Sequence, residues 1–169
     1  TITWLMPDDA PARVQYAVEE DFDDGFDAAW QSIAVGVPFA GDAYRYTATI
    51  TGLSPDTQYV YRVGRDGAWS EPLSFSTSPA GPENFTFLYL GDVQSGYAQW
   101  GNMLEQIYSE NPQLKFALLG GDLTDKGHDP EEWGEFLAAA TGLFSRISMM
   151  PTMGNHDGIM YLNFFALPD

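Results

Sequence analysis

Three segments of the sequence place a glycine and then polar side chains directly after a run of apolar residues. They are Gly91-Asp92 after Phe85–Leu90, Gly121-Asp122 after Phe116–Leu119, and Gly154-Asn155-His156-Asp157 after Ser148–Met153. Carboxylate, amide and imidazole groups bind divalent cations, and histidine also transfers protons near neutral pH. One Gly-Asp pair after a strand is usually a turn or a helix N-cap. The same arrangement repeated three times predicts one site built from all three segments.

The apolar runs that precede these side chains are predicted to be buried strands. Each run is too short for a helix and is bounded by glycine or polar residues. Two helices are predicted between them, over Ala98–Ser109 and Glu131–Phe144. The order strand–helix–strand–helix–strand predicts parallel strands joined by right-handed crossovers. Because ligands bind at the carboxyl ends of parallel strands, the three polar segments are expected to share one edge of the sheet.

Both predicted helices have an apolar face that is interpreted as ordinary core. The two faces consist of Met103, Leu104, Ile107 and Tyr108 in the first helix and Trp133, Phe136, Leu137 and Phe144 in the second. Asp129-Pro130 gives the second helix a clear beginning, with an N-cap aspartate and a proline in the first turn. Glu131 and Glu132 follow at the positive end of the helix dipole, where acidic residues are stabilising.

Residues 1–78 are predicted to form an all-β sandwich, separated by a linker over 79–84 from the strand–helix region 85–169. Turn residues space the expected strands, which are Thr1–Met6, Arg13–Val18, Ser32–Val37, Ala43–Ile50, Thr57–Val63 and Leu73–Thr77. The segment Leu53–Val63 resembles the tyrosine corner of fibronectin type III domains, which implies that the Tyr59 hydroxyl bonds back to the backbone. The acid-rich segment Glu19–Asp27 is interpreted as a solvated loop rather than a calcium loop, since Phe22 and Phe26 interrupt the carboxylate spacing.

The amino-acid composition argues against several classes of binding partner and of site. The formal net charge is −17, shared by both halves of the sequence, so neither nucleic acid nor an anionic membrane is an expected partner. A phosphate substrate would be repelled as well unless the site carries cations, which favours a metal-dependent site. The absence of cysteine excludes disulfides, thiolate metal ligands and a cysteine nucleophile. No apolar run approaches the length of about 18 residues that a membrane helix needs.

Taken in order, the three polar segments resemble the GDxHG, GDxxDRG and GNH(D/E) motifs of the calcineurin-like metallophosphoesterases. A fibronectin-like sandwich before such a core resembles the purple acid phosphatases, so the resemblance covers nearly the whole chain. It implies a sandwich over 1–78 followed by an α/β region over 85–169 that is the N-terminal half of a metallophosphoesterase core. It also implies hydrolysis of phosphoric esters by a metal-bound hydroxide, with two divalent or trivalent ions of the Fe, Zn, Mn or Mg class.

The resemblance assigns roles to the polar side chains. Asp122 would bridge the two metals, Asp92 would bind the first metal, and Asn155 would bind the second metal and contact the substrate. His156 would bind the substrate and either stabilise the transition state or protonate the leaving alkoxide. Asp157 is expected to hold the His156 ring, which makes His156 and Asp157 the predicted catalytic residues.

Three positions depart from the pattern of the family. Gln94 stands where many relatives have a ligand histidine and is expected to be a weak metal ligand. Asp125 stands where purple acid phosphatases have an iron-binding tyrosine, so no tyrosinate colour is expected. Lys126 replaces the arginine of the second motif and is predicted to contact the phosphate without the bidentate geometry of arginine. The later ligand histidines of the family do not follow Asp157, so residues 1–169 alone are expected to show little or no activity.

The sequence therefore predicts an incomplete piece of a dinuclear metal-dependent phosphoesterase that acts on phosphate esters. The alternative is a non-catalytic secreted or cell-surface binding protein with a decayed phosphoesterase domain. Three parallel strands leave an apolar sheet face and an open edge uncovered, so the chain is expected either to pair with another copy or to be a piece of a longer chain. The expected location is secreted, periplasmic or at the cell surface.

Overall fold

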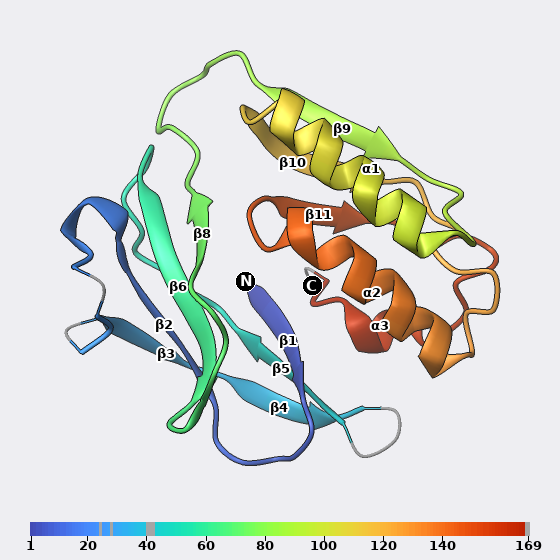
Figure 1. Ribbon diagram of the computed structural model, residues 1–169, viewed down its shortest axis with the longest axis horizontal. Helices are drawn as coiled ribbons and strands as arrows, with labels where there is room; N and C mark the ends of the chain where they lie inside the picture. The colour runs from blue at the N-terminus through green and yellow to red at the C-terminus, as the bar shows by residue number, and fades with distance from the viewer. Residues whose placement is uncertain (24, 28, 40–42, 168–169) are drawn as a thin grey trace. The chain divides into compact units, whose positions relative to one another are not determined.

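The computed structural model describes residues 1–23, 25–27, 29–39 and 43–167. The chain forms two compact units that divide between Gly81 and Pro82 (Figure 1). The first unit contains antiparallel strands, and the second contains a parallel sheet with helices, as the sequence predicts. Asp24, one of the acids in the acid-rich segment, lies outside the described residues, and Glu19–Asp21 of that segment forms a short 3₁₀ turn, η1.

The first unit is a β-sandwich of two sheets. One sheet has the order β1-β5-β4, and the other has the order β3-β2-β6-β7 with β8 paired to β6. Their strands are β1 (Ile2–Met6), β2 (Arg13–Val18), β3 (Trp30–Ile33), β4 (Val35–Pro38), β5 (Tyr44–Ala48), β6 (Gln58–Arg65), β7 (Ala68–Trp69) and β8 (Leu73–Ser76). Val14, Ala48 and Tyr61, from β2, β5 and β6, are buried and pack together between the sheets.

The tyrosine corner predicted at Tyr59 is confirmed. The backbone NH of Ser54 donates a hydrogen bond of 2.9 Å to the Tyr59 hydroxyl, which fixes the turn before β6. The ring itself is buried and stacks on Phe75 of the paired strand β8, with 5.5 Å between the ring centroids. The hydrogen bond and the ring stacking therefore explain Tyr59 and Phe75 as structural residues of the sandwich.

One predicted strand is wrong in an informative way. Ser32–Val37 was expected to be a single strand, whereas the chain breaks at Ala34 into β3 and β4. β3 pairs with β2 in one sheet and β4 pairs with β5 in the other, so the chain crosses between the sheets at this point. Hydrophobicity cannot reveal such a crossing, since both halves of the segment carry similar apolar residues.

The second unit is a three-stranded parallel sheet of order β11-β10-β9, connected by two helices. Its elements are β9 (Thr86–Leu90), α1 (Tyr97–Glu110), β10 (Leu114–Leu119), α2 (Pro130–Phe144), β11 (Ser148–Pro151) and the short helix α3 (Tyr161–Phe164). Figure 1 shows α1 and α2 side by side on one face of this sheet. The β-α-β-α-β order agrees with the sequence prediction, and α3 is an addition to it.

The helices begin and pack as their sequences indicate, with one exception. The Asp129 carboxylate accepts a hydrogen bond of 3.0 Å from the Glu131 NH, and Pro130 occupies the first turn of α2. In α1 the buried residues include Trp100 and Leu104, whereas Met103, predicted to belong to the apolar face, is exposed. The buried face of α1 therefore lies closer to its beginning than the periodicity suggests.

The two faces of the parallel sheet differ in burial. On the side of the helices, Ala117 and Leu119 of β10 are fully buried. On the other side, Phe87 and Tyr89 of β9 are 46% and 68% exposed, and Met150 of β11 is 48% exposed. This apolar face agrees with the expectation of an uncovered sheet surface, and exposed apolar area of this kind usually marks a contact site.

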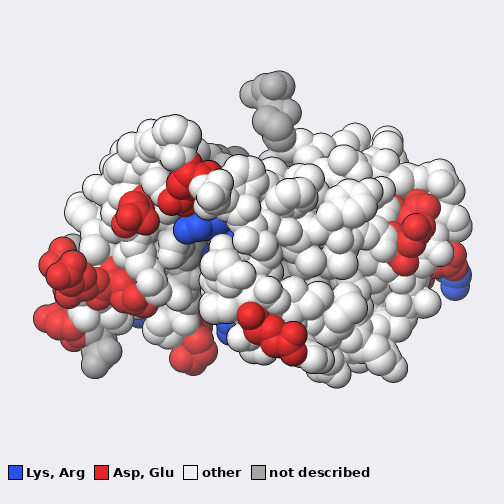
Figure 2. All heavy atoms as spheres, turned by 90° about the horizontal axis from the view of Figure 1, so that it is seen from above, with Lys and Arg blue, Asp and Glu red and all other residues white. Residues whose placement is uncertain are grey.

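The surface carries the acidic excess that the composition implies. On the face drawn in Figure 2, Asp and Glu side chains form several separate patches, and few Lys or Arg atoms are visible. Across the residues that the structure describes, no helix is both long and apolar enough to cross a membrane.

Candidate active site

The three predicted polar segments come together at the carboxyl ends of β9, β10 and β11 through direct backbone contacts. The NH of Gly120 donates to the Leu90 carbonyl at 2.6 Å, and the NH of Asp92 donates to the Gly121 carbonyl at 3.1 Å. Asp92 and Asp122 each adopt a positive φ of 51°. Positive φ is uncommon for residues other than glycine and is concentrated at functional sites, where surrounding contacts maintain it.

The glycines of the motifs permit this close approach. A Cβ atom at Gly121 would lie 2.7 Å from the Gly154 nitrogen. A Cβ atom at Gly154 would overlap the amide nitrogen and the carboxylate of Asp122. Both glycines are therefore required because neighbouring loop backbones occupy the space of a side chain.

Asp122, in the second segment, is hydrogen-bonded to both of the other segments. Its Oδ1 accepts a hydrogen bond of 2.9 Å from the His156 NH. Its carbonyl oxygen accepts one of 3.3 Å from the NH of Gln94, in the first segment. Asp122 therefore fixes the relative positions of the three segments.

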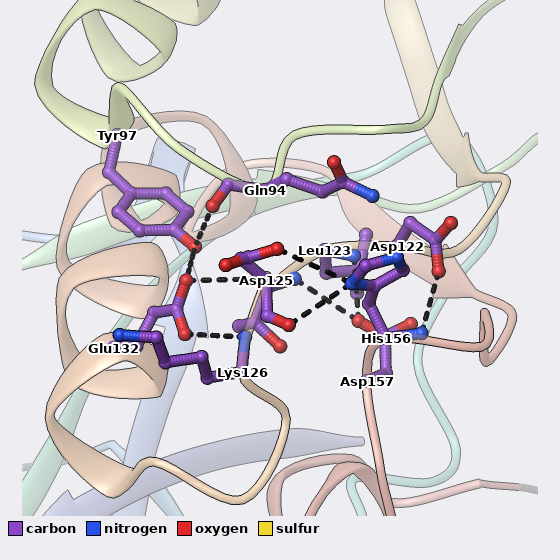
Figure 3. A network of polar contacts seen from close by, with 10 residues as sticks. Gln94, Tyr97, Asp122, Leu123, Asp125, Lys126, Glu132, His156 and Asp157 are labelled. Atoms are coloured by element: carbon purple, nitrogen blue, oxygen red, sulfur yellow. Dashed lines mark hydrogen bonds and ion pairs between the residues drawn. The ribbon is translucent and has the colours of Figure 1, made fainter.

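The His156 ring is held by Asp125. Nδ1 of the ring lies 3.1 Å from the Asp125 carbonyl oxygen and 3.4 Å from Oδ1 of its carboxylate (Figure 3). Because a carbonyl oxygen only accepts hydrogen bonds, Nδ1 carries the proton, and Nε2 is the ring atom left to exchange one. The backbone hydrogen bond to Asp125 raises the pKa of His156 above its ordinary value against the opposing effect of desolvation, and the carboxylates of Asp122, Asp125 and Asp157 add to the rise.

The structure corrects the role predicted for Asp157. This side chain is fully buried, and its carboxylate accepts three backbone hydrogen bonds, from the NH groups of Leu123 (2.7 Å), Thr124 (3.1 Å) and Gly154 (2.7 Å). Asp157 therefore fastens the second segment to the third instead of holding the His156 ring. The prediction failed because adjacent residues in a loop point in different directions, which spacing alone does not show.

Asp157→Asn is expected to lower the free energy of unfolding of the metal-free protein by about 2–3 kcal/mol. The asparagine amide group would face one of the three backbone NH donors, so a charge-assisted hydrogen bond is lost and that buried donor remains unpaired. Denaturation in urea measures the change. Asp92→Asn is a matched control, since Asp92 is exposed and should shift stability by only about 0.5 kcal/mol or less. Equal stability of the two variants would contradict a structural role for Asp157.

Two residues that the sequence did not single out for this site are Glu132 and Tyr97. The Tyr97 hydroxyl, at the beginning of α1, donates a hydrogen bond of 2.7 Å to Glu132, in the first turn of α2. Glu132 also accepts hydrogen bonds from the backbone NH groups of Asp125 and Lys126. Burial would raise the pKa of Glu132, but the hydrogen bonds from Tyr97, Asp125 and Lys126 outweigh it and lower the pKa. The sequence contains no sign of these contacts, because the interaction of Glu132 with the positive end of the helix dipole was already a sufficient reason for an acid at this position.

Among the described residues, the side chains of the other predicted metal ligands do not gather in one cluster. Asp92 and Asn155 are exposed and Gln94 is half-buried, so their oxygens are accessible. Lys126 is also exposed and is fixed only through its backbone. Within the described part of the chain, no group of three or more His, Cys, Asp or Glu side chains is close enough to hold a metal ion. The carboxylate and amide oxygens fit hard cations in chemical type, but two carboxylates and two amides are too few to fill two coordination shells.

Comparisons with known proteins agree with this architecture. Residues 1–77 match the family model of the purple acid phosphatase N-terminal domain, and residues 85–168 match that of the calcineurin-like phosphoesterases. A purple acid phosphatase from yellow lupin seeds has a similar structure, with a TM-score of 0.79 and 18% identity, covering 99% of this chain and 38% of that one. Residues 85–168 therefore belong to the calcineurin-like phosphoesterases, and residues 1–77 to the purple acid phosphatase N-terminal domain family.

The curated relatives are much longer than this chain. A protein of Arabidopsis thaliana named "Probable inactive purple acid phosphatase 24" is 23% identical over 142 residues, covering 73% of this chain and 23% of its own length. An uncharacterized protein of Mycobacterium tuberculosis is 27% identical over 150 residues, covering 72% of this chain and 28% of its own length. The chain thus spans about a quarter of the length of these relatives.

Proposed function

We propose that the protein hydrolyses phosphoric esters with two metal ions held at the carboxyl edge of the parallel sheet. The observation that supports this most strongly is the convergence of Asp92, Asp122 and the Asn155–His156 segment, with the His156 NH bonded to the Asp122 carboxylate at 2.9 Å. An ordinary Gly-Asp turn is not expected to lie in contact with two similar segments. Family membership supports the same reaction class.

In this proposal Asp122 would hold both metal ions, Asp92 the first and Asn155 the second, with Gln94 as a further weak ligand. The metal ions, which would belong to the Fe, Zn, Mn or Mg class, would supply an activated nucleophile and neutralise the charge of the phosphate. Oxygen donors from further residues or from water must complete both coordination shells, since four side chains are too few.

The other predicted site residues would have separate roles in proton transfer, phosphate binding and loop geometry. His156 would donate a proton from Nε2 to the oxygen of the leaving alcohol, while Asp125 holds Nδ1 and so sets the orientation of the ring. Asn155 and Lys126, both exposed, would contact the phosphate oxygens. Asp157 would contribute through the loop geometry that it maintains.

The direct test compares phosphatase and phosphodiesterase activity of residues 1–169 with that of the full-length protein, both supplied with Mn²⁺ or Zn²⁺. The full-length protein is expected to be active and to lose its activity on chelation. Residues 1–169 are expected to show at most about 1% of that rate, because loosely held metals misplace the reacting atoms and about 1 Å of misplacement costs on the order of 100-fold. Comparable activity of the two proteins would refute the ligand assignment, and an inactive full-length protein would refute the function.

A second candidate is a non-catalytic binding protein with a decayed phosphoesterase domain. It is favoured by Gln94 at the position of a ligand histidine and by the sparse ligand set of the described residues. The printed name of the Arabidopsis relative also describes an inactive protein. Metal analysis separates the two candidates, since only the enzyme needs two ions per chain.

We further propose that the protein acts in a secreted, periplasmic or cell-surface location, which the strong acidity and the fibronectin-like sandwich support. The exposed sheet face at Phe87, Tyr89 and Met150 supports self-association as a second mode of contact, besides binding of the phosphate ester. The acidic charge makes nucleic acid an unsuitable partner.

A further inference from the structure

Glu132 connects two loops of the candidate active site through a single carboxylate (Figure 3). Its Oε1 accepts hydrogen bonds from the Tyr97 hydroxyl (2.7 Å) and from the Asp125 NH (2.9 Å), and its Oε2 accepts one from the Lys126 NH (2.7 Å). The Tyr97 hydroxyl also lies 3.0 Å from the Gln94 carbonyl oxygen. The loop after β9 and the loop after β10 are therefore joined at Glu132.

The network extends to the ring of His156. Asp125, whose NH is bound by Glu132, contacts Nδ1 of His156 with its carbonyl oxygen at 3.1 Å and its carboxylate at 3.4 Å. A displacement of the Asp125 backbone would therefore move the atoms that orient the ring. Tyr97 gives the network a rigid end, since its ring is buried and packs edge-on against Phe136 at 6.3 Å between centroids.

The arrangement requires a carboxylate. Three donors converge on Glu132, and two carboxylate oxygens can accept all of them. A glutamine has one acceptor oxygen, so its amide group would face at least one donor and that hydrogen bond would be lost. Glutamine has almost the same shape and packs in the same place, so Glu132→Gln tests the hydrogen bonds without creating a cavity.

We propose that Glu132 is a positioning residue, which holds the Asp125–Lys126 backbone so that Asp125 keeps the His156 ring in its orientation. The inference rests on the proposed phosphoester hydrolysis, in which His156 donates a proton. Glu132 itself does not touch the substrate, and it acts through Asp125 and, by way of Tyr97, through the loop that carries Gln94.

The kinetic test uses Glu132→Gln in the full-length protein, with Glu131→Gln as the matched control. Glu131 lies in the same first turn of α2 and is exposed, so the control removes the same charge from the helix N-terminus without touching the loops. Glu132→Gln is expected to lower kcat by about 10- to 100-fold with KM changed by less than about threefold, because the reacting groups are misplaced while substrate binding is retained. The control should stay within about twofold of the parent protein. Equal kcat values for the two variants would overturn the proposal.

A second measurement does not depend on activity. In the metal-free protein, hydrogen exchange of the Asp125 and Lys126 amides and the ring resonances of His156 are compared by NMR. Glu132→Gln is expected to accelerate exchange of at least one of the two amides by at least about tenfold and to shift the His156 ring resonances, whereas Glu131→Gln changes neither. Unchanged ring resonances would overturn the positioning role, even if the amides exchange faster.

Tyr97→Phe serves as the second variant if Glu132→Gln does not fold. It retains the buried ring and removes the hydroxyl, which contacts Glu132 and the Gln94 carbonyl, but leaves the hydrogen bonds of Glu132 to the Asp125 and Lys126 NH groups in place. A smaller decrease in kcat of about three- to tenfold is therefore expected, with the ring resonances of His156 shifted in the same direction. If the full-length protein shows no turnover at all, the proposed function fails, while the NMR comparison still decides whether Glu132 positions His156. Identical ring resonances in the parent protein and in Tyr97→Phe would also overturn the proposal.

Discussion

Asp122→Asn is expected to release most of the metal bound by the full-length protein and to lower its activity by at least about 1000-fold. The proposed bridging carboxylate serves both cations at once, so a neutral side chain weakens two sites with one substitution. Metal ions supply several kcal/mol of transition-state stabilisation, and each 1.4 kcal/mol corresponds to about tenfold in rate. The structure makes the substitution clean, since the asparagine oxygen can still accept the hydrogen bond that Asp122 receives from the His156 NH.

Elemental analysis after gel filtration measures the metal content of this variant. Asp92→Asn and Asn155→Ala provide a graded comparison, because each is expected to affect mainly one of the two ions. Asp129→Asn is the neutral control: it removes an acid from the same loop, yet asparagine caps a helix as well as aspartate does. Full metal occupancy in Asp122→Asn would show that Asp122 is not the bridge.

Much of the second unit could be predicted because its strands and helices are encoded locally. Phe116–Leu119 lies within β10, and Glu131–Phe144 differs from α2 by one residue at its beginning. Short apolar runs bounded by glycine, a helix cap at Asp129 and a change of periodicity are all local signals. The meeting of Asp92 and Asp122 then follows from parallel topology alone, since successive strands must end on the same side.

The details of the site could not be predicted because they depend on hydrogen bonds to backbone groups. Asp157 follows His156 in the chain, which suggested a catalytic pair, but its carboxylate binds the NH groups of Leu123 and Gly154 in the interior. Asp125 contacts the ring instead, although it lies 31 positions away in the chain. Backbone NH groups have no sequence signature, so the partner of a buried acid is visible only in three dimensions.

The same limit explains why Glu132 and the strand break at Ala34 were missed. An acid in the first turn of a helix already has a sufficient explanation in the helix dipole, and its hydrogen bonds to another loop add nothing to the sequence pattern. At Ala34 the chain changes sheets, and the residues on both sides remain suitable for strands. At Glu132 and at Ala34 the local sequence agreed with a simple rule, and tertiary contacts determined the actual structure.

His156→Ala is expected to lower the turnover of the full-length protein by roughly 10²–10⁴-fold while leaving its metal content unchanged. The imidazole ring is the only part of this residue that the substitution removes, and the backbone NH that binds Asp122 is retained. His128→Ala is the matched control, since His128 is exposed and is the other of the two histidines in the sequence. It should leave turnover within about twofold of the parent protein.

The dependence of this loss on the leaving group identifies what His156 does. A general acid matters most for alkyl phosphates, whose alkoxides are poor leaving groups, and matters little for nitrophenyl phosphates, which need little protonation. The His156→Ala defect is therefore expected to be at least about tenfold smaller for the nitrophenyl ester. The geometry supports this expectation, because the contact of Nδ1 with the Asp125 carbonyl leaves Nε2 to carry the transferred proton. An equal defect for good and poor leaving groups would instead assign His156 an electrostatic role toward the phosphate.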